Sequence, residues 1–468
     1  MIIYIHTSSI HEIYSKNSRL SETILQEGGR MNSQPYSFIL GCVADDFTGA
    51  SDVASFLAEG GARCLLINGI PGNDFVLEPG YDAVVIALKT RNADPHSAVA
   101  DTTGSFDWLQ QKGAKKLYFK YCSTFDSTPK GNIGPVLDAL LEQFNIPYTI
   151  LCPALPVNKR IVKEGILYVD GMPLDKSPMR YHPVNPMWDS SIVRLMEAQS
   201  KYPCFTLDYR HMYRDKDAIT EYIADLELHN SHFYLVGDYF EEEHGARQAE
   251  LFHELPLLSG GSALPKHLFK HYAESNPIYG NRLSSNKTKD STSQRGLILS
   301  GSCSVATRSQ IRNFINRGGT AFEIKAEGLM DGSQTVEDIW RFIEHNPAED
   351  ILIYSFNNDR GKIDQAKQAR ISGKLEGTVA RLGRMAVETG ITNIVVAGGE
   401  TSGAVIQALG SAAFEIGAAL APGVPILYPR GYPDLKITLK SGNFGQPDFF
   451  SRALSVMKGV SDPDEYPG

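Results

Sequence analysis

The feature that most constrains the fold of this chain is a repeated switch between short buried runs and helical spacing. The apolar run Phe38–Ala44 has the length and composition of a buried strand. Residues 48–59 follow it and carry apolar side chains at the spacing of one helix face. Because strands that alternate with helices form layered folds, the pattern predicts an α/β protein with mostly parallel sheets.

The same strand–turn–helix unit recurs along most of the sequence. The Pro-rich stretch within 156–230 interrupts it, because closely spaced prolines cannot form regular helix. The pattern predicts strands at 38–44, 63–68, 82–88, 116–121, 148–152, 231–237, 296–300, 320–325, 350–355, 393–397 and 435–440. It predicts helices at 48–59, 96–112, 134–144, 188–200, 241–254, 304–317, 334–344 and 371–389.

Length and local composition predict how the chain is divided. At roughly 150 residues per domain, a chain of 468 residues holds two or three domains. Residues 1–35 lack a regular pattern and are expected to be a disordered extension, and 275–294 are dense in Ser, Asn, Lys and Thr, as in a linker. We therefore predict two α/β domains, at 36–274 and 295–460.

The overall charge and the cysteines restrict partners and compartment. With 45 Lys and Arg against 54 Asp and Glu, the formal charge is -9, which argues against a general nucleic-acid binder. The longest apolar runs have the length of strands, so we expect no membrane partner. Six cysteines without a C-x-x-C pair are expected to be reduced core residues of a cytoplasmic protein.

Paired carboxylates stand directly after the first predicted strand. Asp45 and Asp46 begin the turn that leads into the helix at 48–59. One of them could act as a base toward a hydroxyl group, and the pair could bind hydroxyls or a magnesium ion. The alternative is an ordinary helix N-cap, which Asp forms readily. The residues alone leave these interpretations open.

Three cations follow neighbouring predicted strands. Lys89 and Arg91 come after the strand at 82–88, and Lys120 lies in the strand at 116–121. Because they would meet at one sheet edge, they suit a carboxylate or phosphate, although each alone could be a solvated charge. Asp126 is expected nearby, as a salt partner or a substrate contact.

Three loops of small residues lie in the second half of the chain. Ser302 is in the Ser-Gly-Ser turn at 300–302, a Gly-Gly-Glu-Thr turn occupies 398–401, and a Ser-Gly-Asn-Phe-Gly loop occupies 441–445. Small residues at helix starts let phosphates approach backbone N–H groups, although caps and tight turns use them too. The density of such loops favours a nucleotide site. The sequence contains no P-loop motif, no G-x-G and no G-x-S-x-G.

These turns together resemble the four-carbon acid sugar kinase family over about residues 38–455. The resemblance is carried by Gly41-Cys42-Val43-Ala44-Asp45-Asp46-Phe47-Thr48-Gly49-Ala50, by Lys120-Tyr121-Cys122-Ser123-Thr124-Phe125-Asp126-Ser127-Thr128 with Gly131-Asn132-Ile133-Gly134, by Ala397-Gly398-Gly399-Glu400-Thr401-Ser402-Gly403, and by Leu439-Lys440-Ser441-Gly442-Asn443-Phe444-Gly445. It implies an acid-sugar domain at 36–274, an ATP domain at 295–460 and a cleft between them.

The resemblance also implies roles for individual residues. An Asp of the 45–46 pair would be the catalytic residue, and magnesium would bridge the phosphates of the co-substrate ATP. The implied acid-sugar contacts are Asp45, Asp46, Lys89, Arg91, Lys120 and, beside them, Asp126. The implied ATP contacts are Ser302, Gly398, Gly399, Glu400, Thr401, Ser441 and Gly442.

The implied reaction is transfer of a phosphoryl group from ATP to the terminal C4 hydroxyl of a four-carbon acid sugar. The motifs are most similar to those of family members that act on 3-oxo-tetronate, with D-threonate and D-erythronate as alternative substrates. A non-catalytic two-domain binding protein is a further alternative. Acid sugar and ATP are the expected partners, and the sequence leaves open whether the chain forms a homodimer.

Overall fold

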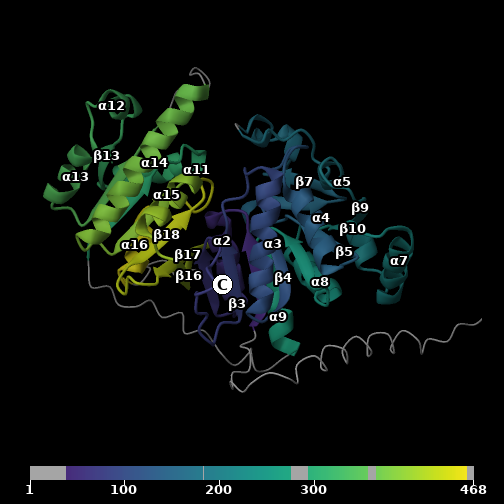
Figure 1. The fold of residues 1–468 in the computed structure, drawn as a ribbon. Helices are drawn as coiled ribbons and strands as arrows, with labels where there is room; N and C mark the ends of the chain where they lie inside the picture. The colour runs from purple at the N-terminus through teal and green to yellow at the C-terminus, as the bar shows by residue number, and fades with distance from the viewer. Residues whose placement is uncertain (1–37, 183, 276–293, 357–364, 461–468) are drawn as a thin grey trace, which may run out of the picture. The chain divides into compact units, whose positions relative to one another are not determined.

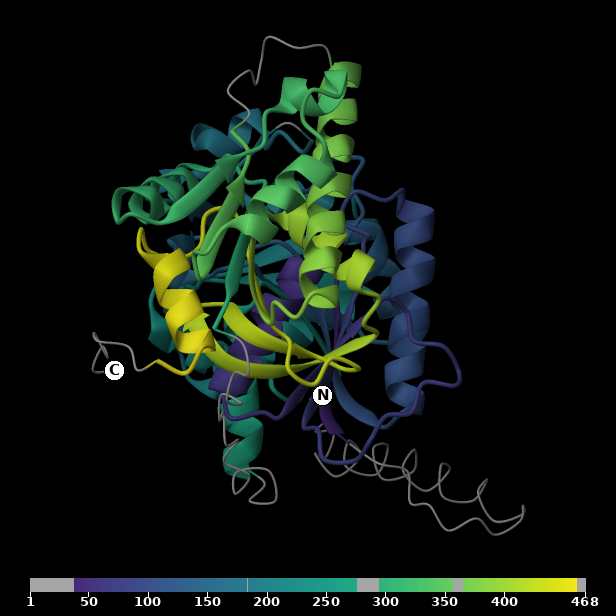
Figure 2. The ribbon, with the colours of Figure 1, turned by 90° about the vertical axis from the view of Figure 1, so that its left-hand side faces the viewer.

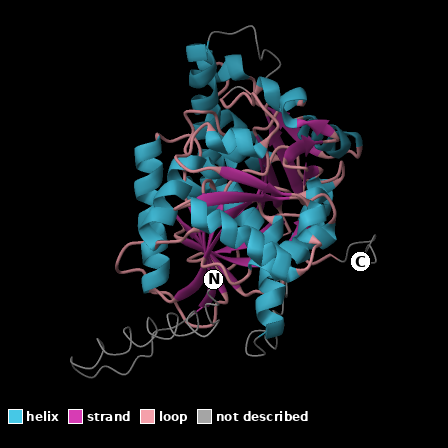
Figure 3. Ribbon diagram, turned by 90° about the vertical axis from the view of Figure 1, so that its right-hand side faces the viewer, coloured by secondary structure: helices cyan, strands magenta, loops and turns pink. Residues whose placement is uncertain are grey.

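The computed structural model describes residues 38–182, 184–275, 294–356 and 365–460. The predicted extension at 1–35 lies outside these residues, as does nearly all of the predicted linker at 275–294. We call the described residues up to 275 the N-terminal half and those from 294 the C-terminal half. Helices and strands alternate in both, which confirms the predicted α/β class (Figures 1 and 3).

The N-terminal half is built on parallel strands in the order β2-β3-β1-β4-β11-β5-β10-β9. These strands are β1 (Phe38–Ala44), β2 (Cys64–Asn68), β3 (Ala83–Ala87), β4 (Ala114–Lys120), β5 (Tyr148–Cys152), β9 (Cys204–Leu207), β10 (Phe233–Gly237) and β11 (Leu257–Gly260). Its helices are α2 (Phe47–Glu59), α3 (Pro95–Gln111), α4 (Ile133–Phe144), α5 (Ile192–Glu197), α6 (Tyr209–Met212), α7 (Lys216–His229), α8 (Glu242–Phe252) and α9 (Ala263–Ser275).

Helix α2 is buried along almost its whole length, unlike a typical surface helix. Its sequence, FTGASDVASFLAE, is rich in Gly, Ala and Ser, and every residue from Phe47 to Ala58 is buried. Small side chains allow close packing on several sides at once. The helix contacts β2, β3 and α9 of its own half, and it also contacts strands and a helix of the C-terminal half.

The C-terminal half has parallel strands in the order β13-β14-β12-β15-β18, followed by antiparallel β17 and β16. These are β12 (Gly296–Ser300), β13 (Thr320–Glu323), β14 (Asp350–Tyr354), β15 (Asn393–Ala397), β16 (Ala413–Ala421), β17 (Val424–Pro429) and β18 (Lys436–Lys440). The helices are α11 (Val305–Asn316), α12 (Ala326–Asp331), α13 (Val336–His345), α14 (Gln365–Glu388), α15 (Gly399–Leu409) and α16 (Phe449–Met457). Helix α14 lies beside α15 (Figures 1 and 2).

The strands of the two halves join into a single mixed sheet. Strand β16 pairs antiparallel with β2, with Phe414 opposite Leu66. The ring of Phe414 also meets Phe47 of α2 edge to face, at 5.3 Å between centroids. In the described part of the chain, fifteen strands are thereby hydrogen-bonded in one order. The sequence pattern predicts mostly parallel sheets but contains no local signal for this pairing between halves.

The Pro-rich stretch forms a small separate sheet. Strands β6 (Arg160–Lys163), β7 (Ile166–Val169) and β8 (Met172–Pro173) pair antiparallel, and 3-10 turns surround them. The helix predicted at 188–200 was too long, because the chain forms helix only over α5. The cause is local, since Ser191 caps the helix by accepting the N–H of Arg194, and the N–H groups of Ser190 and Ser191 both donate to Asp189 Oδ1.

No helix in the described ranges is both long enough and apolar enough to cross a membrane.

Candidate active site

Two aspartates and one arginine meet where β1 and β3 end. The guanidinium of Arg91 donates from Nε to Asp45 Oδ2 at 2.9 Å and from Nη2 to Asp45 Oδ1 at 2.7 Å. The same Nη2 donates to Asp46 Oδ1 at 2.7 Å. Of the three cations predicted to meet at one sheet edge, Arg91 is therefore already paired with two carboxylates.

Asp46 also fulfils the alternative role predicted for it, that of helix cap. Its Oδ1 accepts the N–H of Gly49 at 2.8 Å, which satisfies a free donor in the first turn of α2. The hydrogen bonds among the described residues use Oδ1 of Asp46 and leave Oδ2 out. The Asp46 side chain is 27% exposed, against 6% for Asp45. One oxygen of Asp46 is therefore available to an incoming hydroxyl group.

Burial perturbs the ionisation of Asp45. Desolvation raises the pKa of this carboxyl above its usual range, and the charge and hydrogen bonds of Arg91 oppose that rise. Both oxygens of Asp45 are used by Arg91. Asp45 is thus placed to hold the guanidinium, and Asp46 to face the solvent side of the site.

Lys120 lies beneath the start of α2. Its side chain is buried, and Nζ donates to the carbonyl of Tyr121 at 2.9 Å. A methyl group added at Gly49 would lie 3.0 Å from this Nζ, so the ammonium lies close under the first turn of α2. Lys120 therefore lies near the paired aspartates, as predicted.

Asp52, which the sequence analysis did not single out, belongs to the same charged cluster. Burial raises the pKa of Asp52 to about 7, and the charge of Lys120 lowers it. Oδ2 accepts the hydroxyl of Ser262 at 2.6 Å, and Oδ1 is buried without a hydrogen-bond partner among the described residues. The sequence feature that could have identified Asp52 is its place as the sixth residue of a helix rich in Gly, Ala and Ser.

Two other predicted residues lie outside the Asp45–Arg91 network. Lys89 is exposed, and its charge opposes the rise that burial causes in the pKa of Glu376, in α14 of the C-terminal half. Asp126 accepts the hydroxyl of Thr124 at 2.8 Å and raises the pKa of Cys122, while Arg91 lowers it. Asp126 is therefore an electrostatic neighbour of Cys122, whereas Lys89 lies within electrostatic range of the other half.

Asn132 holds the loop that carries Arg91. Its side-chain amide is buried and donates to the carbonyls of Thr90 at 2.7 Å and Ala93 at 3.1 Å. Asn132 also precedes helix α4, so one residue connects two segments. In the sequence Asn132 belongs to the Gly-Asn-Ile-Gly string at 131–134, and an amide side chain directly after a glycine was the signal that could have identified it.

The three small-residue loops of the C-terminal half converge at the carboxyl ends of β12, β15 and β18. The N–H of Gly398 donates to the carbonyl of Lys440 at 2.9 Å. Gly398 has φ +124°, a region that favours glycine, and a methyl group there would lie 3.3 Å from the N of Ser302 and 3.1 Å from Thr401 Oγ1. The predicted Ser302, Gly398 and Thr401 are thus neighbours.

The loop after β18 closes the same cluster. A methyl group at Gly442 would lie 2.7 Å from Ser302 Oγ, so only glycine fits there without a shift. The carbonyl of Gly442 accepts the Thr307 hydroxyl at 2.8 Å and the Ser304 hydroxyl. Ser441 is half-buried beside it. Ser304 is the cap of α11, in agreement with the cap alternative for this turn, whereas Thr307 in the first turn of α11 was not predicted.

Free backbone donors face this cluster from the start of α15. Helix α15 has no side-chain cap, so the N–H groups of Gly399, Glu400 and Thr401 lack intrahelical partners. A methyl group at Gly399 would meet nothing within 4 Å, and Glu400 is exposed. Such a helix start favours an anion, most of all a phosphate.

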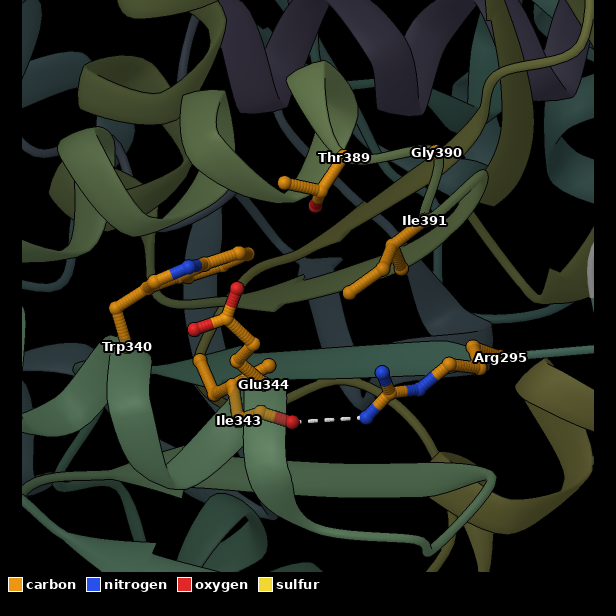
Figure 4. A pocket seen from close by; sticks show the side chains of 7 residues that line it. All are labelled: Arg295, Trp340, Ile343, Glu344, Thr389, Gly390 and Ile391. Atoms are coloured by element: carbon orange, nitrogen blue, oxygen red, sulfur yellow. Dashed lines mark hydrogen bonds between the residues drawn. The ribbon is translucent and has the colours of Figure 1, made fainter.

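A cavity of about 260 Å³ lies at the opposite ends of these strands (Figure 4). Arg295 precedes β12, and its Nη2 donates to the carbonyl of Ile343 at 2.8 Å. The cavity is bordered by Trp340 and Ile391, which precedes β15. Because ligands of open parallel sheets bind beyond the carboxyl ends, this cavity is separate from the candidate site.

In the described residues, no group of three or more His, Cys, Asp or Glu side chains is arranged to hold a metal ion.

The chain matches two family models in succession. Residues 40–268 match a sugar-binding N-terminal domain, and residues 297–450 match a nucleotide-binding C-terminal domain. The first model covers the Asp45–Arg91 network and the second covers the three small-residue loops.

Curated relatives and solved structures cover nearly the whole chain. A 3-oxo-tetronate kinase of Pectobacterium atrosepticum is 40% identical, over 88% of this chain and 98% of its own length. One from Pseudomonas savastanoi pv. phaseolicola is 36% identical, over 92% and 99%. A Salmonella typhimurium LT2 structure superposes with a TM-score of 0.77 at 36% identity, covering 88% of this chain and 98% of its own; one from Haemophilus influenzae gives 0.70 at 36%, covering 89% and 100%. The chain belongs to the four-carbon acid sugar kinase family.

Proposed function

We propose that this protein transfers a phosphoryl group from ATP to the terminal C4 hydroxyl of 3-oxo-tetronate, forming 3-oxo-tetronate 4-phosphate. The observation that carries the proposal is the pairing of two sites at strand ends. One holds an aspartate with an unused oxygen, and the other holds a helix start with free N–H groups. Relatives that match over almost their full length are named 3-oxo-tetronate kinase.

In this proposal each half supplies one substrate site. The acid-sugar domain is 36–274, the ATP domain is 295–460, the segment 275–294 links them, and transfer takes place in a cleft between them. The electrostatic coupling of Lys89 with Glu376 supports a short distance between the two sites. Phosphoryl transfer depends mainly on positioning and charge neutralisation, which two adjacent sites can supply.

The geometry divides the roles of the two aspartates. Asp46 would accept the proton of the C4 hydroxyl at Oδ2, the oxygen that the cap and the ion pair leave unused. Asp45 would fix Arg91 through its two hydrogen bonds. Because aspartates already balance the charge of Arg91 and part of the charge of Lys120, the exposed Lys89 would supply most of the attraction for the acid's carboxylate, with Lys120 as a second contact.

On the nucleotide side, phosphate oxygens would bind the N–H groups of Gly399, Glu400 and Thr401, with Ser302, Ser441 and Gly442 opposite them. Gly398 would allow the close approach of these loops.

Magnesium fits this site as a companion of ATP. Protein-bound Mg²⁺ uses one or two carboxylates together with substrate phosphates. Burial and the nearby charge of Glu400 raise the pKa of Glu376, which indicates two neighbouring carboxylates beside the nucleotide turn. Glu376 and Glu400 would hold the ion, which when bound neutralises phosphate charge.

A panel assay tests the proposed reaction. ATP consumption would be measured with Mg²⁺ and 3-oxo-tetronate, D-threonate or D-erythronate, one acid at a time, with an acid-free control. We expect the highest kcat/KM with 3-oxo-tetronate. A higher value with either hydroxy acid would reassign the substrate, and no acid-dependent consumption would support the non-catalytic binding protein instead.

A further inference from the structure

Lys440 is the last residue of β18 and is completely buried, with 0% exposure. Its carbonyl accepts the N–H of Gly398, so its backbone is bonded directly to the Gly-Gly-Glu-Thr turn. Its Nζ donates to Thr307 Oγ1 at 2.8 Å and to the carbonyl of Gly442 at 3.2 Å. Lys440 therefore touches two of the three loops of the nucleotide site, and its amine lies behind them.

The hydrogen-bond partners of this amine are neutral, which is unusual for a buried lysine. Buried ammonium groups are normally paired with a carboxylate, since burial strongly disfavours an uncompensated charge. Burial lowers the pKa of Lys440 to about 7, and no hydrogen bond or ion pair joins its amine to a charged side chain of the described residues. The charged side chains at the starts of the adjoining helices α11 and α15, Arg308 and Glu400, are not hydrogen-bonded to the amine either.

Lys120 provides a contrast within the same chain. It is also a buried lysine at the carboxyl end of a strand, and its Nζ also donates to a carbonyl. Its charge, however, acts on the carboxyl groups of Asp45 and Asp52. The lysine of the N-terminal half therefore has built-in counter-charges, whereas Lys440 has none among the described residues.

Lys440 has no counter-charge among the described residues, and a bound anion could supply one. The loops in front of Lys440 expose free N–H groups that suit phosphate, and a nucleotide would add several negative charges there. We infer that Lys440 is a positioning residue of the nucleotide site that takes up a proton from solvent when ATP binds, and so becomes the ammonium that balances the phosphates. This inference rests on the proposed function, because it takes ATP as the ligand.

The hydrogen-bond chain explains how the charge would act without direct contact. The amine donates to Thr307, whose hydroxyl donates to the Gly442 carbonyl, and the Ser304 hydroxyl also reaches this carbonyl. A full ammonium strengthens the bonds that it donates to Thr307 and Gly442. Protonation would therefore fasten the loop at 441–442 against the start of α11 at the moment when phosphate binds.

Calorimetry of the full-length protein tests this inference. ATP with Mg²⁺, without acid sugar, would be titrated at pH 8 in two buffers of different ionisation enthalpy. The difference in heat gives the protons taken up per nucleotide. At pH 8 about one Lys440 amine in ten is protonated, given a pKa of about 7. We expect uptake of about 0.5–0.9 proton, since the terminal phosphate of ATP is already ionised at this pH.

Two arginine variants identify the residue that takes up the proton. Lys440→Arg keeps a permanent charge, so it should bind ATP with proton uptake near zero. Lys436→Arg is the matched control, because Lys436 is buried at the other end of the same strand and donates to the Met457 carbonyl at 2.6 Å. The control should keep the wild-type uptake.

The possible results distinguish a failure of the inference from a failure of the proposed function. Wild-type uptake below about 0.2 proton with ATP bound would overturn the inference and leave the proposed function intact. Unchanged uptake in Lys440→Arg would overturn it too. If Lys440→Arg does not fold, the proton uptake measured for the wild type still tests the inference. No ATP binding by the wild type would overturn both.

Discussion

Replacing Asp46 by Asn should abolish most of the activity and leave the fold almost unchanged. Asn retains an oxygen at the position of Oδ1, and it caps helices as well as Asp does. The bond from the Gly49 N–H therefore persists, and α2 keeps its first turn. What disappears is the carboxylate that we propose as the base, a contribution of about 10²–10⁴ in rate.

The structural cost of this change can be worked out from the contacts. Arg91 loses the charge of one partner but keeps both hydrogen bonds to Asp45. Asp46 is 27% exposed, so the pair is partly solvated, and an exposed pair contributes ~0.2–1 kcal/mol. We expect the free energy of unfolding to fall by less than about 1 kcal/mol.

Asp45→Asn should lower the free energy of unfolding more than Asp46→Asn does. Asp45 is nearly buried and accepts two of the three hydrogen bonds that Arg91 donates to the aspartates. Breaking a buried pair costs ~3–5 kcal/mol, but Asn keeps one acceptor and Asp46 remains, so about 1–3 kcal/mol is expected. Turnover should fall as well, because Arg91 moves.

The assay measures kcat with saturating ATP and 3-oxo-tetronate, and chemical unfolding of each variant. The reasoning is refuted if Asp46→Asn retains kcat within about threefold of wild type, since a general base contributes at least ~10². A loss of stability in Asp46→Asn equal to that in Asp45→Asn would also contradict the division of roles.

Three further changes test other parts of the site. Asn132→Ala leaves two loop carbonyls without their donor, with an expected stability loss of ~1–3 kcal/mol. Because the loop would no longer hold Arg91 in place, kcat should fall about tenfold or more. Asn132→Asp keeps the side-chain shape but not the amide donor, so it should not restore kcat. Gly442→Ala places a methyl group 2.7 Å from Ser302 Oγ, so KM for ATP should rise several-fold in steady-state kinetics, with 3-oxo-tetronate KM unchanged. The folded-state pKa of Asp52 is raised to about 7, so the folded state binds more protons than the unfolded state between about pH 4 and 7. The stability of the wild type therefore falls as the pH rises through this window. The unfolding midpoint of Asp52→Asn should fall less over the same window.

Much of the sheet was predictable because its signals are local. The runs that form β1, β12, β15 and β18 are short and rich in apolar residues, and each prediction agrees with the structure to within one residue. Parallel strands bring their carboxyl ends to one edge, so Arg91 and Lys120 were expected at the same place, and both act on the carboxyl group of Asp45. The pairing of Arg91 with Asp45 and the place of Lys89 outside it were not predicted.

The features that escaped prediction depend on long-range packing. The sequence around Phe414 contains no pattern that predicts the pairing of β16 with β2, which lies more than 300 residues earlier. Asp52 and Lys440 resemble ordinary solvated charges in the sequence, and only the packing around them shows that they are buried. The state of a buried ionisable group depends on what surrounds it, and a one-dimensional pattern does not contain that information.

The pairing of β16 with β2 has a consequence for any attempt to separate the halves. Separating the halves would break the pairing of β2 with β16, so that β2 would keep only β3 and β16 only β17, and each half would have one bare strand edge. Unpaired edges recruit other strands, so each fragment would tend to aggregate or to pair with copies of itself. The aromatic contact of Phe47 with Phe414 would be lost at the same time and would expose apolar surface on both pieces. Although two family models divide this chain, its halves are expected to remain soluble only when they are made together.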